Sequence, residues 1–375
     1  MPPVSADDRL RIHYRVRFSE GEPAADRARD IAYEQTVELP AACVNRELTD
    51  HFVGRVESVE RGSLDWAQVT ISYASERLVD DGAQLLNLLF GNISLKRGIQ
   101  IRSIEWPVSM LQQFGGPRYG ADGLQTLAGN DGSKPLLCAA LKPVGLNVEQ
   151  LGELCYQFAA GGANLIKDDH GITNQPSAPF RERLQSCQAA VERAQQERGQ
   201  PCLYFPNVSG PSATLHERLE LARDTGCKGV MISPMLTGID SLQQIRAFDD
   251  LALLAHPALS GMMFGDDHGL LPELVLGDLF RMLGADGVIY PNVGGRFPFD
   301  ARQCARINDQ LREPFGELLA SAPAPGGGID VKLIAHWVAQ YGAQTILLIG
   351  GSLYAQADLT LATSELMKAI DKASS

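Results

Sequence analysis

Short apolar runs alternate with amphipathic helical patterns from Pro135 to the end of the chain. Runs of strand length that break into polar or glycine-rich residues are typical of buried parallel strands. There are eight, in order LLCAALK, NLIKD, CLYFPN, GVMISP, LALLAH, GVIYPN, a run reaching residues 326–328, and TILLIGG. Eight strands alternating with helices over roughly 240 residues predict a (β/α)8 TIM barrel rather than an open doubly wound sheet.

A different pattern precedes the barrel. Residues 10–18 alternate apolar and polar side chains, as in a strand with one solvated face. A helical stretch at 24–33, runs at 51–59 and 66–74, a helix at 81–90 and a strand at 99–106 complete a β-α-β-β-α-β order. This order is that of the ferredoxin-like split unit. We predict a ferredoxin-like α+β domain at 1–128 and the barrel domain at 129–375, divided within the turn-rich segment 115–135.

Composition narrows the class of protein. The 375 residues are 45% hydrophobic and carry a net charge of −12, so a large core is available and nucleic acid is not an expected partner. No apolar stretch approaches the ~20 residues of a membrane span, and MPPVSADDRLR lacks an apolar signal core. We therefore expect a cytoplasmic protein without membrane contacts. Seven scattered cysteines without a CxxC motif predict buried thiols rather than disulfides or a zinc knuckle.

Four ionisable side chains follow one another at the end of the second barrel strand. Residues 164–170 read NLIKDDH, which places a lysine, two carboxylates and an imidazole where barrel enzymes keep their active sites. A solvated strand-to-helix turn is the alternative for this motif taken alone. Lys142 ends the first strand and is expected near Lys167, and neighbouring cations with partial burial lower a lysine pKa enough for it to act as a base.

Glycine clusters end the last two strands. Gly326, Gly327 and Gly328 end the seventh strand, and Gly350 and Gly351 end the eighth. Backbone N–H groups at such positions approach anions closely, and barrels often bind phosphate there, so we predict a phosphorylated substrate. The alternative is that these glycines only relieve crowding in tight turns.

One further motif, FGDDHG at 264–269, follows the fifth barrel strand. Its carboxylates and imidazole could form a second ligand cluster. A solvated loop over the barrel mouth is the competing interpretation.

The strand-end motifs together resemble the ribulose-bisphosphate carboxylase (RuBisCO) large-chain family, and more narrowly its RuBisCO-like proteins, which do not fix CO2. The strongest match is GGANLIKDDHGITNQP, against a family pattern with KDDE and a following NQP. LKPVGLN, GGGI before Asp330 and LLIGGS match at three further strand ends. The resemblance covers nearly the whole chain, including the ferredoxin-like domain.

The resemblance implies roles for residues of the barrel. Lys167 matches the lysine whose carbamate ligates Mg2+, and Asp169 matches a second ligand. Lys142 matches the lysine that assists enolisation and proton transfer, and His256 matches a barrel histidine after strand five. Gly328, Gly350 and Gly351 match backbone contacts to phosphate.

The resemblance also implies a homodimer or a higher homo-oligomer. Glu34 and Asn92, both in the N-terminal domain, match residues that enter the active site of the partner subunit.

Several positions depart from the carboxylase pattern. His170 stands where the third metal ligand is Glu, which points to another divalent metal, a rearranged site, or a histidine outside the metal shell. Pro257 replaces an arginine that holds one substrate phosphate. Gly287 and Ile289 occupy histidine positions after strand six, and Arg296 stands near the position of the mobile-loop lysine. We therefore do not expect carboxylation.

With carboxylation set aside, the chemistry that the resemblance implies is enediolate formation from a phosphorylated ketose. A divalent cation polarises the carbonyl while a lysine moves the proton. The resemblance implies an enolase or isomerase acting on a substrate such as 5-methylthioribulose 1-phosphate. A decarboxylase of a 3-oxo sugar-acid phosphate is one alternative, and a non-catalytic phosphometabolite-binding protein is another.

Overall fold

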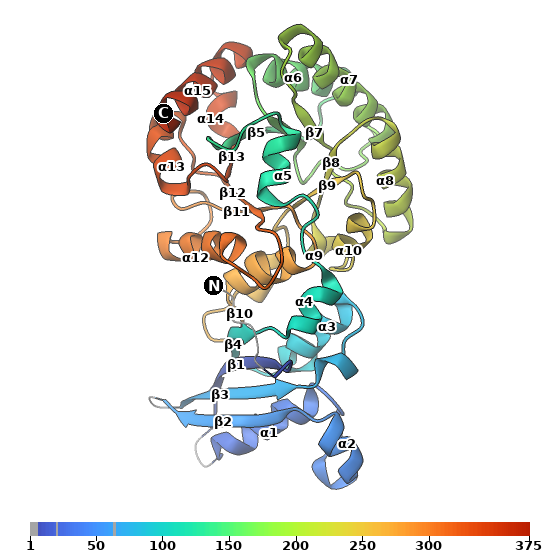
Figure 1. Ribbon diagram of the computed structural model, residues 1–375, viewed down its shortest axis with the longest axis vertical. Coiled ribbons are helices and arrows are strands. Elements are labelled where there is room, and N and C mark those ends of the chain that lie inside the picture. The colour runs from blue at the N-terminus through green and yellow to red at the C-terminus, as the bar shows by residue number, and fades with distance from the viewer. Residues whose placement is uncertain (1–6, 20–21, 63–64) are drawn as a thin grey trace.

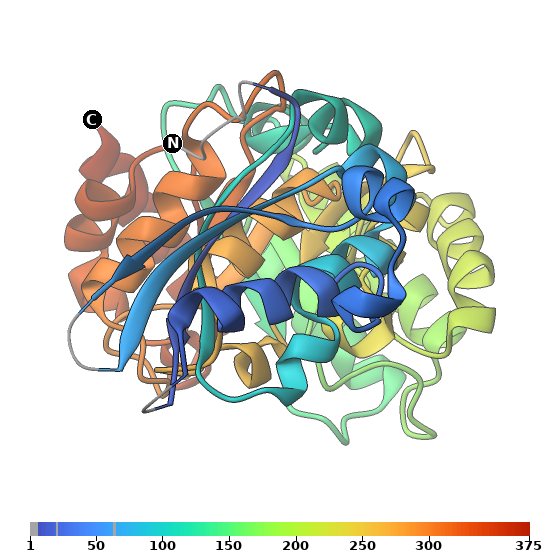
Figure 2. The same cartoon turned by 90° about the horizontal axis from the view of Figure 1, so that it is seen from below.

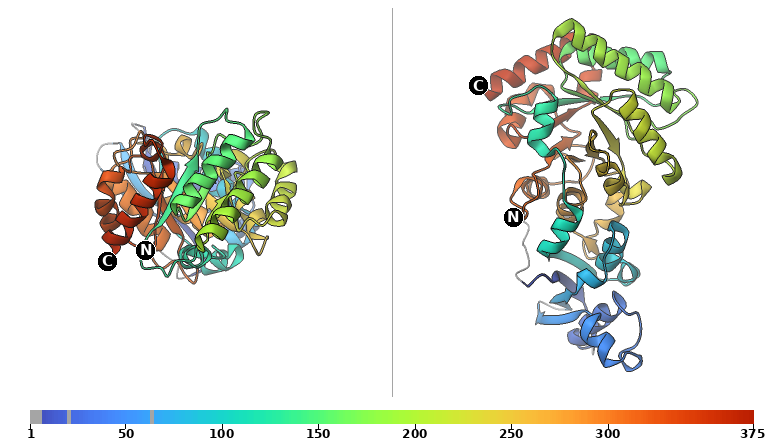
Figure 3. Two further views of the ribbon diagram at one scale, coloured as in Figure 1. Left: turned by 90° about the horizontal axis from the view of Figure 1, so that it is seen from above. Right: turned by 45° about the vertical axis from the view of Figure 1, so that its right-hand side comes forward.

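The computed structural model describes residues 7–19, 22–62 and 65–375. An eight-stranded barrel forms the larger body, and a smaller domain built around a second sheet lies against one side of it (Figure 1). The right-hand view of Figure 3 shows the elongated shape that results. Both predicted fold classes are confirmed.

The N-terminal domain has the predicted β-α-β-β-α-β order. Its elements are β1 (Leu10–Arg17), α1 (Ala24–Glu34), β2 (Arg55–Arg61), β3 (Trp66–Tyr73), α3 (Gly82–Phe90) and β4 (Ile99–Glu105). The four strands are antiparallel and lie in the order β4-β1-β3-β2. Alternate residues of β1 are buried, as its period-two pattern predicts, and α1 runs across the sheet (Figure 2).

One predicted strand begins later than expected. The run at 51–59 forms β2 only from Arg55, because residues Arg46–His51 form a short helix, α2. The side chain of Asn45 caps this helix by accepting a hydrogen bond from the Leu48 amide.

All eight predicted barrel strands are present. They are β5 (Leu136–Leu141), β6 (Leu165–Asp168), β7 (Leu203–Phe205), β8 (Gly229–Ile232), β9 (Ala252–Ala255), β11 (Gly287–Pro291), β12 (Ala322–Gly326) and β13 (Ile346–Ile349). They pair in parallel in the order β7-β6-β5-β13-β12-β11-β9-β8. A parallel bridge between Asn207 and Met231 joins the two ends, so the barrel closes.

Helices surround the barrel, as Figure 1 shows. They include α6 (Val148–Gly161), α7 (Phe180–Arg198), α8 (Leu215–Asp224), α10 (Ser241–Arg246), α12 (Ala301–Arg312), α13 (Ile334–Tyr341) and α15 (Leu359–Ser374). Between β9 and β11 lie η6 (Leu274–Leu279), a π-helix, and α11 (Phe280–Met282). No helix in the described part of the chain is long and apolar enough to cross a membrane. The cytoplasmic location stays a prediction.

The linker between the domains contains two helices, α4 (Val108–Phe114) and α5 (Gly120–Leu127). Ala121 and Leu124 of α5 are buried in the same apolar cluster as residues of the barrel interior. Asp286, just before β11, accepts hydrogen bonds from the amides of Tyr119 and Gly120, at 2.6 and 2.8 Å. Helix α5 therefore covers the amino-terminal end of the barrel, opposite the mouth, and we propose that the barrel domain begins before α5 rather than at residue 129.

The cysteines are all free thiols. Six of them are buried, as predicted. Cys43 is exposed, so the prediction is wrong for that residue.

Candidate active site

The ends of β5, β6 and β9 bring together five predicted residues, which we call the mouth cluster. Lys142 follows β5, Lys167 lies in β6, Asp169 and His170 follow β6, and His256 follows β9. They meet because parallel strands of a closed barrel all end at one mouth.

Asp169 lies at the centre of the mouth cluster. Its Oδ1 atom is 3.3 Å from Lys142 Nζ and 3.5 Å from His170 Nδ1. Partial burial favours the protonated carboxyl, but the contact with His170 and the charges of Lys142 and Lys167 outweigh it and hold the pKa of Asp169 below its usual value. The carboxylate is therefore ionised at neutral pH. The Lys142 side chain is 38% exposed, which leaves its amine accessible from the mouth.

Lys167 is almost completely buried, with 2% of its surface exposed. Its Nζ atom donates a hydrogen bond to the Asp168 carbonyl at 3.0 Å. Burial lowers the pKa of Lys167, and the nearby Lys142 charge adds to that effect, while Cys138 and Asp169 oppose it. The lowered pKa increases the fraction of neutral amine, the form that reacts with CO2 to give a carbamate.

His170 and His256 stack on each other, with ring centroids 4.5 Å apart and planes 13° from parallel. Burial lowers the pKa of His256 well below its usual value, and the neighbouring Lys167 and His170 act in the same direction. His256 is therefore neutral at pH 7. Its Nδ1 atom accepts a hydrogen bond from the Ala258 amide at 3.1 Å, which assigns the ring proton to Nε2.

Asp168, the other carboxylate of the motif, faces away from the mouth cluster. It is fully buried and accepts hydrogen bonds from Arg183 Nε at 3.1 Å, Tyr204 Oη at 2.7 Å and the Asn207 amide at 2.8 Å. The Asn207 side chain in turn donates to the His170 carbonyl at 3.0 Å. Asp168 thus fixes the loop that carries Asp169 and His170. Because side chains alternate along a strand, the sequence already contained the signal that Asp168 and Asp169 face opposite sides.

The glycines after β12 and β13 lie beside each other. Gly326 pairs with Leu348, and Ser352 Oγ donates to the Ile329 carbonyl at 3.1 Å. A Cβ atom at Gly350 or Gly351 would meet open space, as an anion site requires.

Gly328 has a different environment. Its φ is +72°, and a Cβ atom there would lie 2.7 Å from the amide nitrogen of Gly295. Any side chain at this position would clash with Gly295, so glycine is required here for steric reasons as well. Phosphate binding by Gly328, Gly350 and Gly351 stays a prediction.

Tyr354 is a residue that sequence reasoning missed. It follows the Gly350–Gly351 turn in α14 (Gly351–Tyr354). Its hydroxyl accepts a hydrogen bond from the Lys142 amide at 2.9 Å and donates to the Ala140 carbonyl at 3.0 Å. Tyr354 therefore joins the glycine turn after the last strand to the backbone of Lys142. Nothing in the sequence near either segment indicated this contact.

Glu34 and Asn92 lie together in the N-terminal domain. Asn92 Nδ2 donates to Glu34 Oε1 at 3.2 Å and to Glu38 Oε1 at 2.6 Å. Lys96 Nζ is 2.7 Å from Glu34 Oε2. These contacts stay within the N-terminal domain, so the structure pairs the two residues with each other rather than with the mouth cluster of the same chain.

Several exposed apolar side chains follow barrel strands, and others lie in the N-terminal domain. Six of them follow carboxyl ends of barrel strands and form what we call the apolar rim: Val144, Leu236, Leu259, Met262, Phe297 and Leu333. Three others, Leu39, Leu48 and Leu95, lie in the N-terminal domain, where Leu39 follows Glu38 and Leu95 belongs to η3 (Asn92–Leu95).

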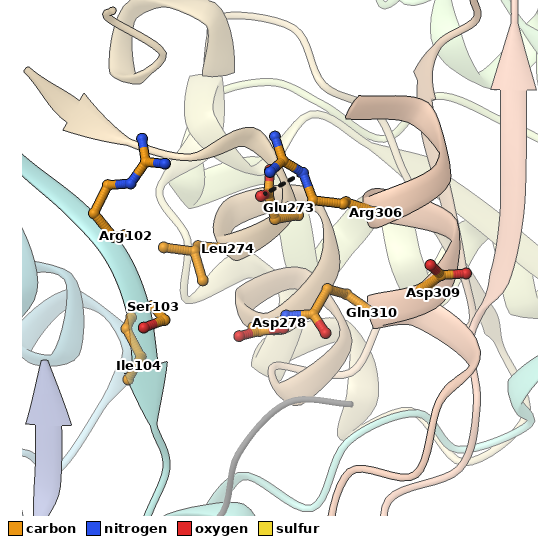
Figure 4. Close-up of a pocket in the computed structure, with 9 residues that line it drawn as sticks. All are labelled: Arg102, Ser103, Ile104, Glu273, Leu274, Asp278, Arg306, Asp309 and Gln310. Carbon is orange, nitrogen blue, oxygen red and sulfur yellow. Dashed lines mark ion pairs between the residues drawn. The ribbon is translucent and has the colours of Figure 1, made fainter. Parts of the chain in front are cut away.

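A cavity of about 240 Å3 lies at the junction of the two domains rather than in the mouth (Figure 4). Arg102 of β4 lines one side and Asp278 of η6 another, and the lining residues Arg306 and Glu273 form an ion pair at 3.0 Å. None of the predicted site residues lines this cavity.

Comparison with known proteins identifies the family. The model of the ribulose bisphosphate carboxylase large chain, catalytic domain, matches residues 121–362. The chain is 36% identical over 371 residues to a 5-methylthioribulose-1-phosphate isomerase from Rhodospirillum rubrum, with 98% of each protein covered. The chain belongs to the RuBisCO large-chain family.

Other RuBisCO family members agree in fold and extent. A 2,3-diketo-5-methylthiopentyl-1-phosphate enolase from Bacillus licheniformis is 31% identical over 348 residues, which cover 89% of this chain and 84% of that protein. The crystal structure of a Rubisco-like protein from Rhodopseudomonas palustris superposes with a TM-score of 0.87 at 35% identity, covering 97% of this chain and 98% of that one.

The structure places the residues of this RuBisCO family chain that depart from the carboxylase pattern, and it corrects one expected location. Pro257 directly follows His256 and offers no charge to a phosphate. Gly287 and Ile289 lie within β11 rather than after it, and Ile289 packs in the barrel interior. Arg296 lies in the loop after β11 and is exposed.

Proposed function

We propose that this chain is a RuBisCO-like enzyme that isomerises or enolises a phosphorylated ketose through an enediolate and does not fix CO2. One observation carries the proposal: the accessible amine of Lys142 lies 3.3 Å from the ionised Asp169, at the mouth of the barrel. A lysine with a carboxylate beside it can take up and return a proton at a substrate placed over the mouth.

The proton transfer follows from this arrangement. In its deprotonated form, the amine of Lys142 removes a proton from the carbon next to the substrate carbonyl. The electron pair of that C–H bond forms the C=C bond of the enediolate, and the negative charge moves to the carbonyl oxygen. Return of a proton to the former carbonyl carbon, with loss of the neighbouring hydroxyl proton, moves the carbonyl along the chain.

The residues around Lys142 orient the substrate and stabilise the charge that develops on its oxygen. Neutral His256 presents its Nε2 proton as a hydrogen-bond donor for a substrate oxygen. Tyr354 fixes the backbone at Lys142, and the open turn at Gly350 and Gly351 supplies amides for the substrate phosphate.

A divalent cation fits this site only with a modified Lys167. In the described part of the chain no three His, Cys, Asp or Glu side chains are grouped to hold a metal. A carbamate on Lys167 would add oxygen donors to Asp169 and His170, and oxygen donors are the ones that Mg2+ prefers. A cation bound there would polarise the substrate carbonyl. Lys167, Asp169 and His170 are the residues that would hold it.

Sequence identity to the two relatives favours isomerisation over the enolase reaction. The isomerase from R. rubrum is 36% identical over 98% of this chain, whereas the enolase from B. licheniformis is 31% identical over 89%. We therefore take 5-methylthioribulose 1-phosphate, or a ketose phosphate of similar shape, as the substrate.

A homodimer with shared active sites completes the proposal. The apolar rim around the mouth and the exposed Leu39 and Leu95 of the N-terminal domain are apolar side chains that a second copy could cover in a symmetric pair. In that arrangement Glu34 and Asn92 of one subunit reach the mouth cluster of the other.

The proposal is tested by incubating the protein with Mg2+, bicarbonate and a panel of ketopentose monophosphates and 3-oxo sugar-acid monophosphates. An isomeric ketose phosphate is the expected product. Release of CO2 from a sugar acid would instead identify a decarboxylase. Binding without turnover across the panel would support a non-catalytic protein and contradict the proposal.

A further inference from the structure

The FGDDHG motif belongs to a segment that links the two domains. We call residues 256–271 the strap, because they run from His256 at the barrel mouth to β10 (Gly269–Leu270). This short strand pairs in parallel with Gln100 and Ile101 of β4, so a barrel loop forms the fifth strand of the N-terminal sheet. The strap is therefore not a loop lying free over the mouth.

The strap is held in a fixed hairpin. Phe264 and Gly269 form an antiparallel bridge. Gly269 has a φ of +102°, and a Cβ atom there would lie 2.0 Å from the Met263 carbonyl oxygen, so this position requires glycine. Gln100 Nε2 donates to the Gly265 carbonyl at 2.7 Å and fixes the hairpin to β4.

His268, at the end of the hairpin, contacts the turn that carries Asn92. Its Nε2 atom lies 2.9 Å from the Ser94 carbonyl oxygen, and Ser94 belongs to η3 (Asn92–Leu95). Its ring packs on Phe90 at a centroid distance of 5.0 Å, and Phe90 ends α3 just before this turn. The imidazole therefore touches the chain on both sides of Asn92.

A carbonyl partner for Nε2 identifies this atom as the donor. Nδ1 faces the Ile99 amide at 3.5 Å, which is compatible with an acceptor at that nitrogen. His268 thus contacts the backbone at Ser94 and at Ile99, and through Ser94 it holds η3, which begins at Asn92.

We propose that His268 is a positioning residue for the reaction, which acts on the partner subunit's active site by fixing the turn that presents Asn92. The proposal rests on the shared active site argued above. His268 thus acts on the active site of the other subunit, although the strap that carries it begins at His256 in the mouth cluster of its own subunit.

Subunit mixing tests this assignment. His268→Leu keeps the packing against Phe90 and removes the hydrogen bond, so we expect a kcat lower by about 10- to 100-fold. His268→Gln, whose amide can still donate to Ser94, should recover most of the activity. His216→Leu, at a histidine whose side chain is 74% exposed, is the matched control and should be unaffected.

The His268→Leu protein is then mixed with Lys142→Met subunits under conditions where subunit exchange is verified by mass spectrometry. Each heterodimer pairs an intact barrel with an intact N-terminal domain at one of its two sites. Random pairing of equal amounts should therefore give about a quarter of wild-type activity. Asn92→Ala mixed with Lys142→Met serves as the reference for site sharing.

The outcomes separate the two proposals. Recovery in both mixtures supports the trans role of His268. Recovery in the Asn92 mixture alone shows that His268 acts within its own subunit, which overturns this inference and leaves shared sites standing. Failure of both mixtures overturns shared sites themselves. Wild-type kcat in the His268→Leu homodimer also overturns the inference.

Discussion

Lys142 Nζ lies 3.3 Å from Asp169 Oδ1, and this contact joins the ends of two adjacent strands of the barrel. Asp169 also contacts His170, which stacks on His256 from a third strand end. An amine, a carboxylate and an imidazole thus lie together directly after the ends of three barrel strands. This arrangement favours proton transfer with little reorganisation.

Ribulose 1,5-bisphosphate should not be carboxylated by this protein. Pro257 cannot pair with a phosphate, and Gly287 and Ile289 provide no imidazole at the positions where carboxylases have histidines. The measurement is radiolabel from bicarbonate in an acid-stable product, with an authentic carboxylase as positive control. Label above the no-enzyme background would contradict the prediction.

Replacement of Lys167 should abolish the dependence of the activity on CO2 and Mg2+. Lys167→Met fills similar volume in this buried position but cannot form a carbamate, so we expect a loss of activity of about 100-fold or more and no response to either addition. Native mass spectrometry should detect one added CO2 on the wild type and none on the variant. A variant that is still stimulated by Mg2+ together with bicarbonate would show that Lys167 is not the modified residue.

Folding stability should contain a pH-dependent contribution from Asp278, which lines the interdomain cavity. Burial raises the pKa of Asp278 to about 7, although the Trp106 hydrogen bond and the charge of Arg281 oppose the shift. A raised carboxyl pKa means that the folded state binds more protons, so this contribution is present below pH 4 and is lost as the pH rises to about 7.

Asp278→Asn should therefore gain stability relative to the wild type as the pH rises from 5 to 8, by on the order of 2 kcal/mol. The amide oxygen can keep the Trp106 hydrogen bond. Urea denaturation at several pH values measures the difference in unfolding free energy, and Asp309→Asn, at the exposed edge of the same cavity, is the control. A difference that does not change with pH would mean that Asp278 ionises normally.

Much of the fold could be predicted because the decisive signals are local. Each barrel strand is a buried apolar run ending in polar or glycine residues, and β1 alternates in period two. The residues of the mouth cluster could be predicted for the same reason. Each follows or ends a locally recognisable strand, and a closed parallel barrel brings the ends of its strands together.

The contacts that were missed join segments far apart in the sequence. Tyr354 bonds the backbone of Lys142 across 212 positions, and His268 bonds Ser94 across 174. Helix α5 lies in a turn-rich linker, and only its burial against the barrel interior reveals its role. Hydrophobic periodicity carries no information on such pairings, because each partner satisfies its own local pattern without the other.

Solvent deuterium exchange tests the central claim most directly. The wild type, with Mg2+, bicarbonate and 5-methylthioribulose 1-phosphate in D2O, should incorporate deuterium at carbon next to the carbonyl, as followed by NMR. Lys142→Met should lower that exchange by about 100-fold or more while substrate affinity stays within a few-fold, because the lysine acts in the transition state rather than in binding. Lys228→Met, at an exposed lysine before β8, is the control and should exchange like the wild type. Near wild-type exchange by the Lys142 variant, or no exchange by the wild type with any ketose phosphate tested, would contradict the account.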